Sequence, residues 1–178
     1  MPRLQPLPLN DLPTETSAAF DKHVQEHHSR ITNMKATMGR SVLVFDIYMR
    51  WYDLYEQVKA IVGIRAAYLF AHAISSGSNC PLCTTYFRKV MIDHHENPAQ
   101  LSLTEAEQIL LDFGSAIATK NGEVNTELYK AVESLYSETE MVVLVGFAGQ
   151  MIATNIFNNV FEVEIDDYLA PYVSMNSK

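Results

Sequence analysis

The chain has 178 residues, of which 48% are hydrophobic and 19% are charged. This composition fits one globular domain and excludes a disordered polyelectrolyte, a collagen-like fibre and a disulfide-dense secreted scaffold. Lys and Arg number 13 against 21 Asp and Glu, so the formal net charge is −8. Because a nucleic acid or an anionic membrane needs clustered positive charge, we expect neither as a partner.

The chain is poor in residues that form turns. It has 7 glycines and 7 prolines, which favours helices over a many-stranded sandwich. Several of the prolines lie in residues 1–13 and indicate an extended lead-in before a first helix. Residues 1–10 lack the apolar core of a signal peptide, and the most apolar stretch, 141–148, is shorter than the roughly 18 residues of a membrane span. We therefore expect a cytoplasmic protein.

Apolar residues recur every three or four positions in the first half of the chain. One run extends from Phe20 to Met38, with a break expected at Thr32–Asn33. A long buried helix is predicted at about 40–59.

The next segment, 62–74, is almost continuously apolar and predicts a helix that ends at Gly77. Ser78 or Asn79 is expected to cap the helix that follows. Pro81 suits the first turn of that helix, where its missing N–H group has no partner to lose.

Two capping boxes mark helix starts in the second half. They are Thr104 with Glu107 and Ser137 with Glu140. The first of these helices ends at Asn121–Gly122, Asn125 caps a short helix, and the last helix runs to about Asn158. Residues 161–166 alternate in polarity but have no partner strand, so they are predicted to form an extended tail. The sequence thus predicts a single-domain, all-α bundle of six to eight helices.

Both cysteines lie in the motif Cys80-Pro-Leu-Cys83, at the expected start of a helix. A structural zinc site needs a second ligand pair, haem attachment needs a histidine where Thr84 stands, and a thioredoxin motif needs a β-α-β unit. We therefore expect no metal and no cofactor. Free N–H groups at the helix start stabilise a thiolate, so one cysteine can attack a peroxide or disulfide and the other can resolve the product. The alternative is that both cysteines pack as small apolar side chains.

This motif, preceded by a long apolar helix and followed by an amphipathic one, resembles the carboxymuconolactone decarboxylase and AhpD-like alkylhydroperoxidase superfamily. The stretches 103–107, 137–141 and 155–158 are also similar to its C-terminal half. The resemblance covers about residues 25–168, preceded by the lead-in and first helix at 1–24 and followed by a C-terminal tail at 169–178. It implies an all-helical AhpD-like bundle, homo-oligomerisation and, in the AhpD-like branch, a cysteine-pair peroxidase that a dithiol donor re-reduces.

The resemblance makes Cys83 the attacking thiol and Cys80 the resolving thiol, whereas position at the helix start alone favours Cys80 as the more acidic one. It also implies a glutamate and two histidines as a proton relay. At those positions this chain has Tyr68, Leu82 and Phe87, so only the two cysteines match the catalytic set.

His72 and Tyr68 are candidate substitutes for this relay. His72 precedes Cys80 by eight residues, and Tyr68 lies one turn earlier on the same helix face. The alternative for His72 is a partly buried histidine with a hydrogen-bond partner.

Other residues carry weaker signals. The adjacent histidines of His27-His28 and His94-His95-Glu96 point about 100° apart on a helix, which favours solvated helix ends over a metal site. A set of aromatic residues either lines a pocket beside the dithiol or packs in the core. Its members are Trp51, Tyr52, Tyr55, Tyr68, Phe70, Tyr86 and Phe87.

We therefore expect a homo-oligomeric cysteine-pair oxidoreductase whose substrate is a peroxide or a small disulfide and whose reductant is a dithiol. One alternative is a decarboxylase-like enzyme on the same fold, acting on a small organic acid or lactone through Arg65, His72 and His94. The other is a catalytically degenerate oligomeric scaffold or redox sensor.

Overall fold

The computed structural model describes residues 1–174, and within this range it contains nine α-helices, one 3₁₀ helix and no β-strand. The helices in chain order are α1 (Thr14–His27), α2 (Asn33–Met38), α3 (Val42–Met49), α4 (Trp51–Val62), α5 (Ile64–Gly77), α6 (Pro81–Asp93), α7 (Glu105–Thr119), α8 (Thr126–Glu133), α9 (Glu138–Phe161) and the 3₁₀ helix η1 (Asp167–Tyr172). The prediction of a single all-α domain is confirmed.

The local start signals act as expected. Both capping boxes form: Thr104 and Ser137 accept hydrogen bonds from the backbone N–H groups of Glu107 and Glu140, whose carboxylates accept from the cap residues in return. Asn125 caps α8 through the N–H group of Leu128. These side chains use donors that a helix start leaves unpaired, which is why the sequence locates the starts well.

The structure has more helices than expected in the N-terminal half. The run from Phe20 to Met38 divides into α1 and α2, because His28 ends α1 in the left-handed conformation and Thr32 caps α2. The helix expected at 40–59 divides into α3 and α4 at Arg50, whose φ of −59° and ψ of −13° remain near helical values. A bend that keeps the backbone near helical geometry changes the apolar spacing little, so periodicity does not reveal it.

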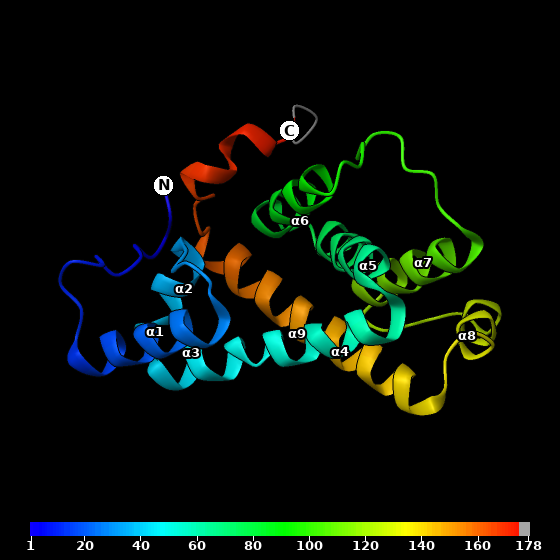
Figure 1. Cartoon of the computed structure of the whole chain (residues 1–178), viewed down its shortest axis with the longest axis horizontal. Helices are drawn as coiled ribbons and strands as arrows, with labels where there is room; N and C mark the ends of the chain where they lie inside the picture. Colours follow the sequence, from blue (N-terminus) through cyan, green and yellow to red (C-terminus); the bar gives the residue numbers. More distant parts are fainter. Residues whose placement is uncertain (175–178) are drawn as a thin grey trace.

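Helix α5 is the centre of the bundle and packs against α4, α6, α7 and α9. Its residues Leu69, Phe70 and Ile74 are fully buried. Gly114 of α7 lets the two helices approach, since a Cβ atom there would lie 2.7 Å from the ring of Phe70. In Figure 1, α4 and α9 run side by side along the molecule, with α1–α3 at one end and α7 and α8 at the other.

The chain after α9 returns to the N-terminal helices. The extended segment predicted at 161–166 starts later than expected, because Phe161 still belongs to α9 and Glu162 ends that helix; residues 163–166 are not helical, as predicted. Asp166 accepts a hydrogen bond of 2.9 Å from the N–H group of Asn33. Helix η1 then packs on α6. Of the C-terminal tail expected at 169–178, residues 169–172 belong to η1 and residues 175–178 lie outside the described range.

Helix α9 is long and apolar enough to cross a membrane by length and composition alone, with a mean hydropathy of 1.5 in its most apolar window. In this fold it is instead a core helix that contacts α4, α5, α7 and α8. Leu144, Phe147 and Met151 are buried on one side, whereas Val142 and Ile156 are 73% and 56% exposed on the other. Core packing thus accounts for one side of α9 and leaves the other apolar side uncovered.

Candidate active site

The two cysteines lie where α5 gives way to α6, and both are free thiols. The predicted cap by Ser78 or Asn79 is wrong: Cys80 is the N-cap residue of α6, and Asn79 takes a positive φ of 50°. The reason is Pro81, which occupies the first helical position as predicted and forces the residue before it out of the helical region. Cys80 accordingly has φ −102° and ψ 100°.

The two thiols form one coupled pair at the start of α6. A hydrogen bond from the Cys83 thiol is the largest influence on Cys80 and, against the effect of burial, lowers its pKa to about 7. The backbone N–H groups of Cys83 and Leu82 and the amide of Asn158 lower the pKa of Cys80 further. The same hydrogen bond, together with burial, raises the pKa of Cys83 well above its ordinary value. Of the two thiols, Cys80 is therefore the one that ionises more easily.

Asn158, in the last part of α9, holds its amide nitrogen toward both sulfurs. The distances from Nδ2 are 3.3 Å to Sγ of Cys83 and 3.9 Å to Sγ of Cys80. The Asn158 side chain is buried, and its amide oxygen has no hydrogen-bond partner among residues 1–174. An amide N–H beside a thiol stabilises the anionic form, so Asn158 supplies part of the electrostatic support that the expected relay residues do not.

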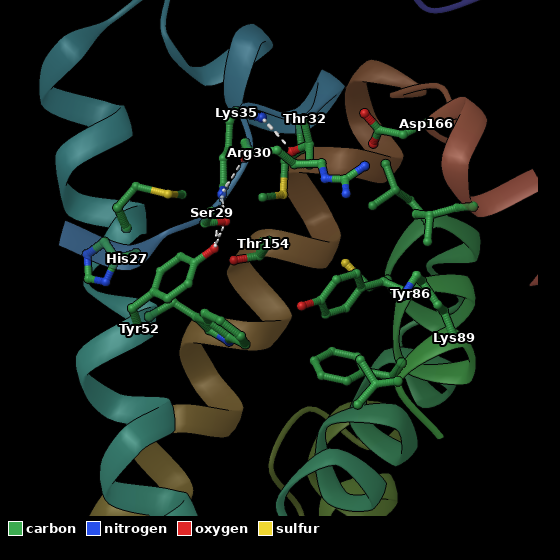
Figure 2. Close-up of a pocket in the computed structure, with 18 of the residues that line it drawn as sticks. His27, Ser29, Arg30, Thr32, Lys35, Tyr52, Tyr86, Lys89, Thr154 and Asp166 are labelled. Carbon is green, nitrogen blue, oxygen red and sulfur yellow. Dashed lines mark hydrogen bonds between the residues drawn. The ribbon is translucent and has the colours of Figure 1, made fainter. Parts of the chain in front are cut away.

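Cys83 lies in the wall of a cavity of about 450 Å³, whereas Cys80 is buried and is not among the lining residues. Six of the lining residues are large aromatic side chains, namely Tyr48, Trp51, Tyr52, Tyr86, Phe87 and Tyr168. Figure 2 shows the hydroxyl groups of Tyr52 and Tyr86 pointing into the same space from α4 and α6. Burial raises the pKa of Tyr86 to about 12, so its hydroxyl is protonated at neutral pH. A cavity of this size with flat walls suits a small planar organic molecule.

One end of the cavity is polar and is built around a buried lysine. Lys35 of α2 is 3% exposed, and its Nζ lies 2.7 Å from Oγ of Ser29, 2.9 Å from the carbonyl oxygen of Arg30 and 2.9 Å from the hydroxyl of Tyr52. Burial lowers the pKa of Lys35 to about 8, although Asp166 opposes this shift. Lys35 is not among the site residues expected from the sequence, although Ile31, Met34 and Met38 place it on the apolar face of the run.

The aromatic set divides between the cavity and the core. Trp51, Tyr52, Tyr86 and Phe87 line the cavity. Tyr55 instead stacks on Phe147 at 5.6 Å, and Phe70 packs in the central core. The pocket and core interpretations are therefore each correct for part of the set.

The two candidate relay residues lie apart from the cavity lining. Tyr68 places its hydroxyl 3.4 Å from Glu96 and stacks on the ring of His94 at 5.2 Å. Burial, with a smaller effect of Arg88, lowers the pKa of His72 to about 4, so that its ring is neutral at neutral pH. The involvement of His72 and Tyr68 in proton transfer stays a prediction. Leu82 and Phe87, at two expected relay positions, form apolar cavity wall.

The remaining histidines do not assemble a metal site. Within residues 1–174 there is no group of three or more His, Cys, Asp or Glu side chains placed to hold a metal ion. His27 stacks on Tyr52 at 4.4 Å, and His28 and His95 have positive φ values of 48° and 63° at the ends of α1 and α6.

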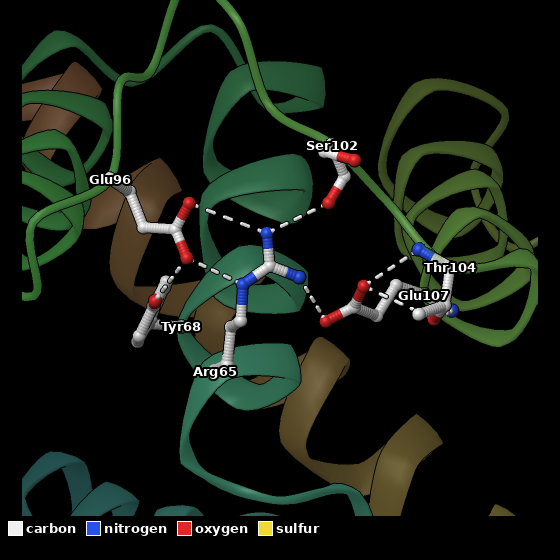
Figure 3. A network of polar contacts seen from close by, with 6 residues as sticks. All are labelled: Arg65, Tyr68, Glu96, Ser102, Thr104 and Glu107. Atoms are coloured by element: carbon white, nitrogen blue, oxygen red, sulfur yellow. Dashed lines mark hydrogen bonds and ion pairs between the residues drawn. The ribbon is translucent and has the colours of Figure 1, made fainter.

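A second polar cluster, shown in Figure 3, surrounds Arg65 at the start of α5. Its guanidinium contacts Glu96, with Nε 2.5 Å from Oε1, and also pairs with Glu107. Nη2 donates to the carbonyl oxygen of Ser102 at 3.1 Å. Because two carboxylates already neutralise Arg65, little of its charge is left for the carboxylate ligand that the decarboxylase-like alternative requires.

Comparison with solved structures gives overlaps along almost the whole chain. The chain is similar to the debrominase Bmp8 in its apo form, with 20% identity and a TM-score of 0.75 over 96% of this chain and 95% of that one. A cysteine-to-alanine variant of Bmp8 in complex with 2,3,4-tribromopyrrole gives 19% identity and a TM-score of 0.75 over 95% and 94%. An uncharacterized peroxidase-related protein from Silicibacter sp. TM1040 gives 15% identity and a TM-score of 0.68 over 94% of each chain.

No protein-family model matches the sequence, and no curated protein matches it. The structural overlaps are nevertheless nearly complete in both directions. The chain therefore shares the fold of this debrominase and this peroxidase-related protein, which confirms, at the level of the fold, the AhpD-like resemblance that the cysteine motif and the helix order predict.

Proposed function

We propose that the protein is a dithiol oxidoreductase that reduces a small organic substrate, with an organic hydroperoxide as the leading class, and is oxidised to a Cys80–Cys83 disulfide. The observation that carries the proposal is the position of Cys83 in the wall of an aromatic cavity, with the more acidic Cys80 hydrogen-bonded to it. The dithiol can deliver two electrons, and the cavity can hold the molecule that takes them.

In this mechanism Cys83 attacks, because it lines the cavity and Cys80 does not, and the Cys80 thiolate accepts the Cys83 proton. Cys80 thus takes the part of general base that the missing relay would have played. The sulfur of Cys83 attacks the terminal peroxide oxygen, the O–O bond breaks, and Cys83 becomes a sulfenic acid. The departing alkoxide takes the proton back from Cys80 and leaves as the alcohol.

The second half of the reaction forms the disulfide. The Cys80 thiolate attacks the sulfur of Cys83, the S–O bond breaks, and hydroxide leaves as water after taking a proton from solvent. A dithiol reductant then restores both thiols by exchange and is itself oxidised to a disulfide. The cytoplasm keeps such a dithiol donor reduced, and we propose that the enzyme acts there.

A halogenated aromatic compound is the second candidate substrate class. Here Cys80 again accepts the Cys83 proton, the sulfur of Cys83 attacks the halogen, and the carbon–halogen bond breaks. The ring carbon keeps the electron pair and takes the proton from Cys80. Cys80 then displaces halide from Cys83 and forms the same disulfide. Two observations favour this class: a similar solved protein is a debrominase with a bound bromopyrrole, and apolar Leu82 and Phe87 occupy relay positions. Halide leaves without a proton, and the apolar side chains at these positions can contact the halogen atoms of the ring.

The test is turnover of cumene hydroperoxide and of 2,3,4-tribromopyrrole by the full chain with dithiothreitol as donor. We expect reduced product and a Cys80–Cys83 disulfide, mapped by mass spectrometry. Cys83→Ser should abolish turnover, and Cys80→Ser should lower it by about 10²–10⁴-fold, the usual contribution of a general base. Tyr129→Phe, on exposed α8, is the matched control and should leave the rate unchanged.

Each outcome is decisive. Turnover of either substrate by the reduced wild-type chain, lost in Cys83→Ser, supports the proposal and identifies the substrate class. Consumption that persists in Cys83→Ser overturns the mechanism. Disulfide formation without turnover of either compound overturns the enzymatic assignment and favours the redox sensor.

A further inference from the structure

The polar end of the cavity, formed by Lys35, Ser29 and Tyr52, has a donor that the protein itself does not use. Figure 2 shows these three side chains joined by hydrogen bonds at the cavity wall. The ammonium group of Lys35 has three hydrogens, and its contacts with Ser29, Arg30 and Tyr52 engage all three. Lys35 therefore acts on the cavity through the two hydroxyl groups that it contacts.

The hydroxyl groups of Ser29 and Tyr52 together have one hydrogen left to donate to a ligand. Oγ of Ser29 and the hydroxyl oxygen of Tyr52 each accept a hydrogen bond from Lys35, and they lie 2.8 Å apart. Their mutual hydrogen bond uses one of the two hydroxyl hydrogens, whichever residue donates it. The other hydroxyl hydrogen has no acceptor in the described part of the chain. Because the ammonium group polarises both oxygens, this remaining hydrogen is a strong donor toward an acceptor in the cavity.

The charge around the cavity points to the same kind of acceptor. Its lining contains Arg30, Lys35 and Lys89 against the carboxylates of Asp93 and Asp166. Asp93 is paired with Lys89, and Asp166 accepts a hydrogen bond from the backbone N–H group of Asn33. The lining thus has a surplus of positive charge in a chain whose formal net charge is −8. Such a surplus in a low-dielectric cavity attracts an anion.

We infer that Lys35, Tyr52 and Ser29 bind an anionic oxygen or nitrogen atom of a small aromatic substrate, such as a phenolate, an aromatic carboxylate or a deprotonated azole. The inference rests on the proposed function, since it names the substrate class of the same cavity. The ring of the substrate lies between the aromatic walls, and its anionic atom accepts the free hydroxyl hydrogen. Lys35 is a positioning residue in this arrangement, because it acts through Tyr52 and Ser29.

The experiment measures binding without chemistry. In a Cys80→Ser, Cys83→Ser double variant, quenching of Trp51 fluorescence reports on ligands in the cavity, because Trp51 is the single tryptophan and lies in the cavity wall. The probes are 2,4,6-tribromophenol, which is ionised at neutral pH, and 2,4,6-tribromoanisole, its uncharged methyl ether. We expect the phenolate to bind about 10- to 100-fold more tightly, the range of one hydrogen bond to a charged group.

Further variants assign the preference to this group of residues. Lys35→Met should bring the two affinities to within about 3-fold of each other, and Tyr52→Phe should lower the preference at least several-fold while it retains the ring and the lysine. Lys22→Met, which changes an exposed lysine of α1 outside the cavity lining, is the matched control and should keep the preference. Circular dichroism checks that each variant is folded, and Tyr52→Phe decides the question if Lys35→Met is not.

Equal binding of the two probes, or a preference that survives both Tyr52→Phe and Lys35→Met, overturns the inference. The absence of binding by either probe overturns it as well. Because the double variant has no thiols, this result is separate from the turnover test. Phenolate binding together with a catalytically inert wild-type chain would support the inference and overturn the proposed function.

Discussion

The polar end of the cavity and the Arg65 cluster both contain buried or half-buried charge, but they handle it in opposite ways. Arg65 contacts two carboxylates and a backbone carbonyl, which together neutralise it and accept hydrogen bonds from four of its five N–H groups. Lys35 contacts two hydroxyl groups and a carbonyl oxygen, none of which carries a compensating charge. The pKa of Lys35 is accordingly lowered, whereas the pKa of Arg65 is raised by its hydrogen bonds to Glu96 and Glu107.

This contrast separates a structural site from a candidate functional one. A paired charge fastens the loop between α6 and α7 to α5, and folding gains from it. An unpaired buried charge destabilises the folded state. Its presence therefore indicates a role in binding or catalysis. In this chain the unpaired lysine faces the same cavity as Cys83.

The largest expected effect is on the pH dependence of stability, compared between the wild-type chain and Lys35→Met. The pKa of Lys35 is about 8 in the folded chain against 10.5 for an ordinary lysine, so between these values the unfolded chain binds more protons. The free energy of unfolding should therefore rise with pH by about 1.4 kcal/mol per pH unit, or roughly 3 kcal/mol across the window, relative to Lys35→Met. Urea unfolding of both proteins from pH 7 to 10.5 measures this.

The groups that face Lys35 are Asp166, Tyr52 and His23, and subtracting the Lys35→Met data removes most of their own titration. Burial, with smaller effects of Lys35 and His27, lowers the pKa of His23 to about 4, so His23 is neutral throughout this window. Identical pH profiles for the two proteins would show that Lys35 is not an unpaired charge.

Replacing Arg65 should change stability at neutral pH in the opposite direction from replacing Lys35, because Arg65 is a paired charge, and the effect should be somewhat smaller. Arg65→Met removes the partner of two carboxylates, and we expect it to lower the free energy of unfolding by about 2 kcal/mol at pH 7. Arg65 holds the pKa of Glu96 below its usual range. The extra stability of the wild-type chain over Arg65→Met should therefore be lost as the pH falls through the pKa of Glu96. Chemical unfolding at pH 7 and pH 3 measures both effects.

Arg50→Met is the control for this change, because Arg50 forms an exposed pair with Asp53 at 3.3 Å and should contribute less than about 1 kcal/mol. Arg65→Met should also leave the phenolate preference of the cavity intact. If Arg65→Met changed that preference as strongly as Tyr52→Phe does, the two regions would not be separate.

The smallest effect on the single chain is expected on the uncovered side of α9. We propose that this side, with Val142, Val145, Ile156 and Val160 exposed, contacts a second copy of the chain in a homo-oligomer. Val142→Lys with Ile156→Lys should change the stability of one chain by less than about 0.5 kcal/mol but shift the oligomer to monomer in multi-angle light scattering. Val24→Lys, on α1, is the matched control. A wild-type chain that is already monomeric would contradict this proposal.

The sequence located the dithiol at the start of α6 because this position depends on near neighbours. Pro81, the two cysteines and the end of α5 at Gly77 lie within a few residues, and free N–H groups at a helix start are a local property. The relay was harder to assign. Tyr68 shares a helix face with His72, but its hydroxyl contacts Glu96 from the loop after α6, a contact that spacing along one helix does not reveal.

By itself the sequence determined the all-α class, the helix starts at Thr104, Asn125 and Ser137, and a dithiol at the start of α6, since each follows from contacts within about four residues. Only the tertiary structure decided which charges are paired and which side chains meet. Lys35, Tyr52 and Cys83 come from three helices, and their shared cavity exists because the chain after α9 folds back over α2 and α6. Burial and pairing of charge depend on such distant contacts, and they decide what the site can bind.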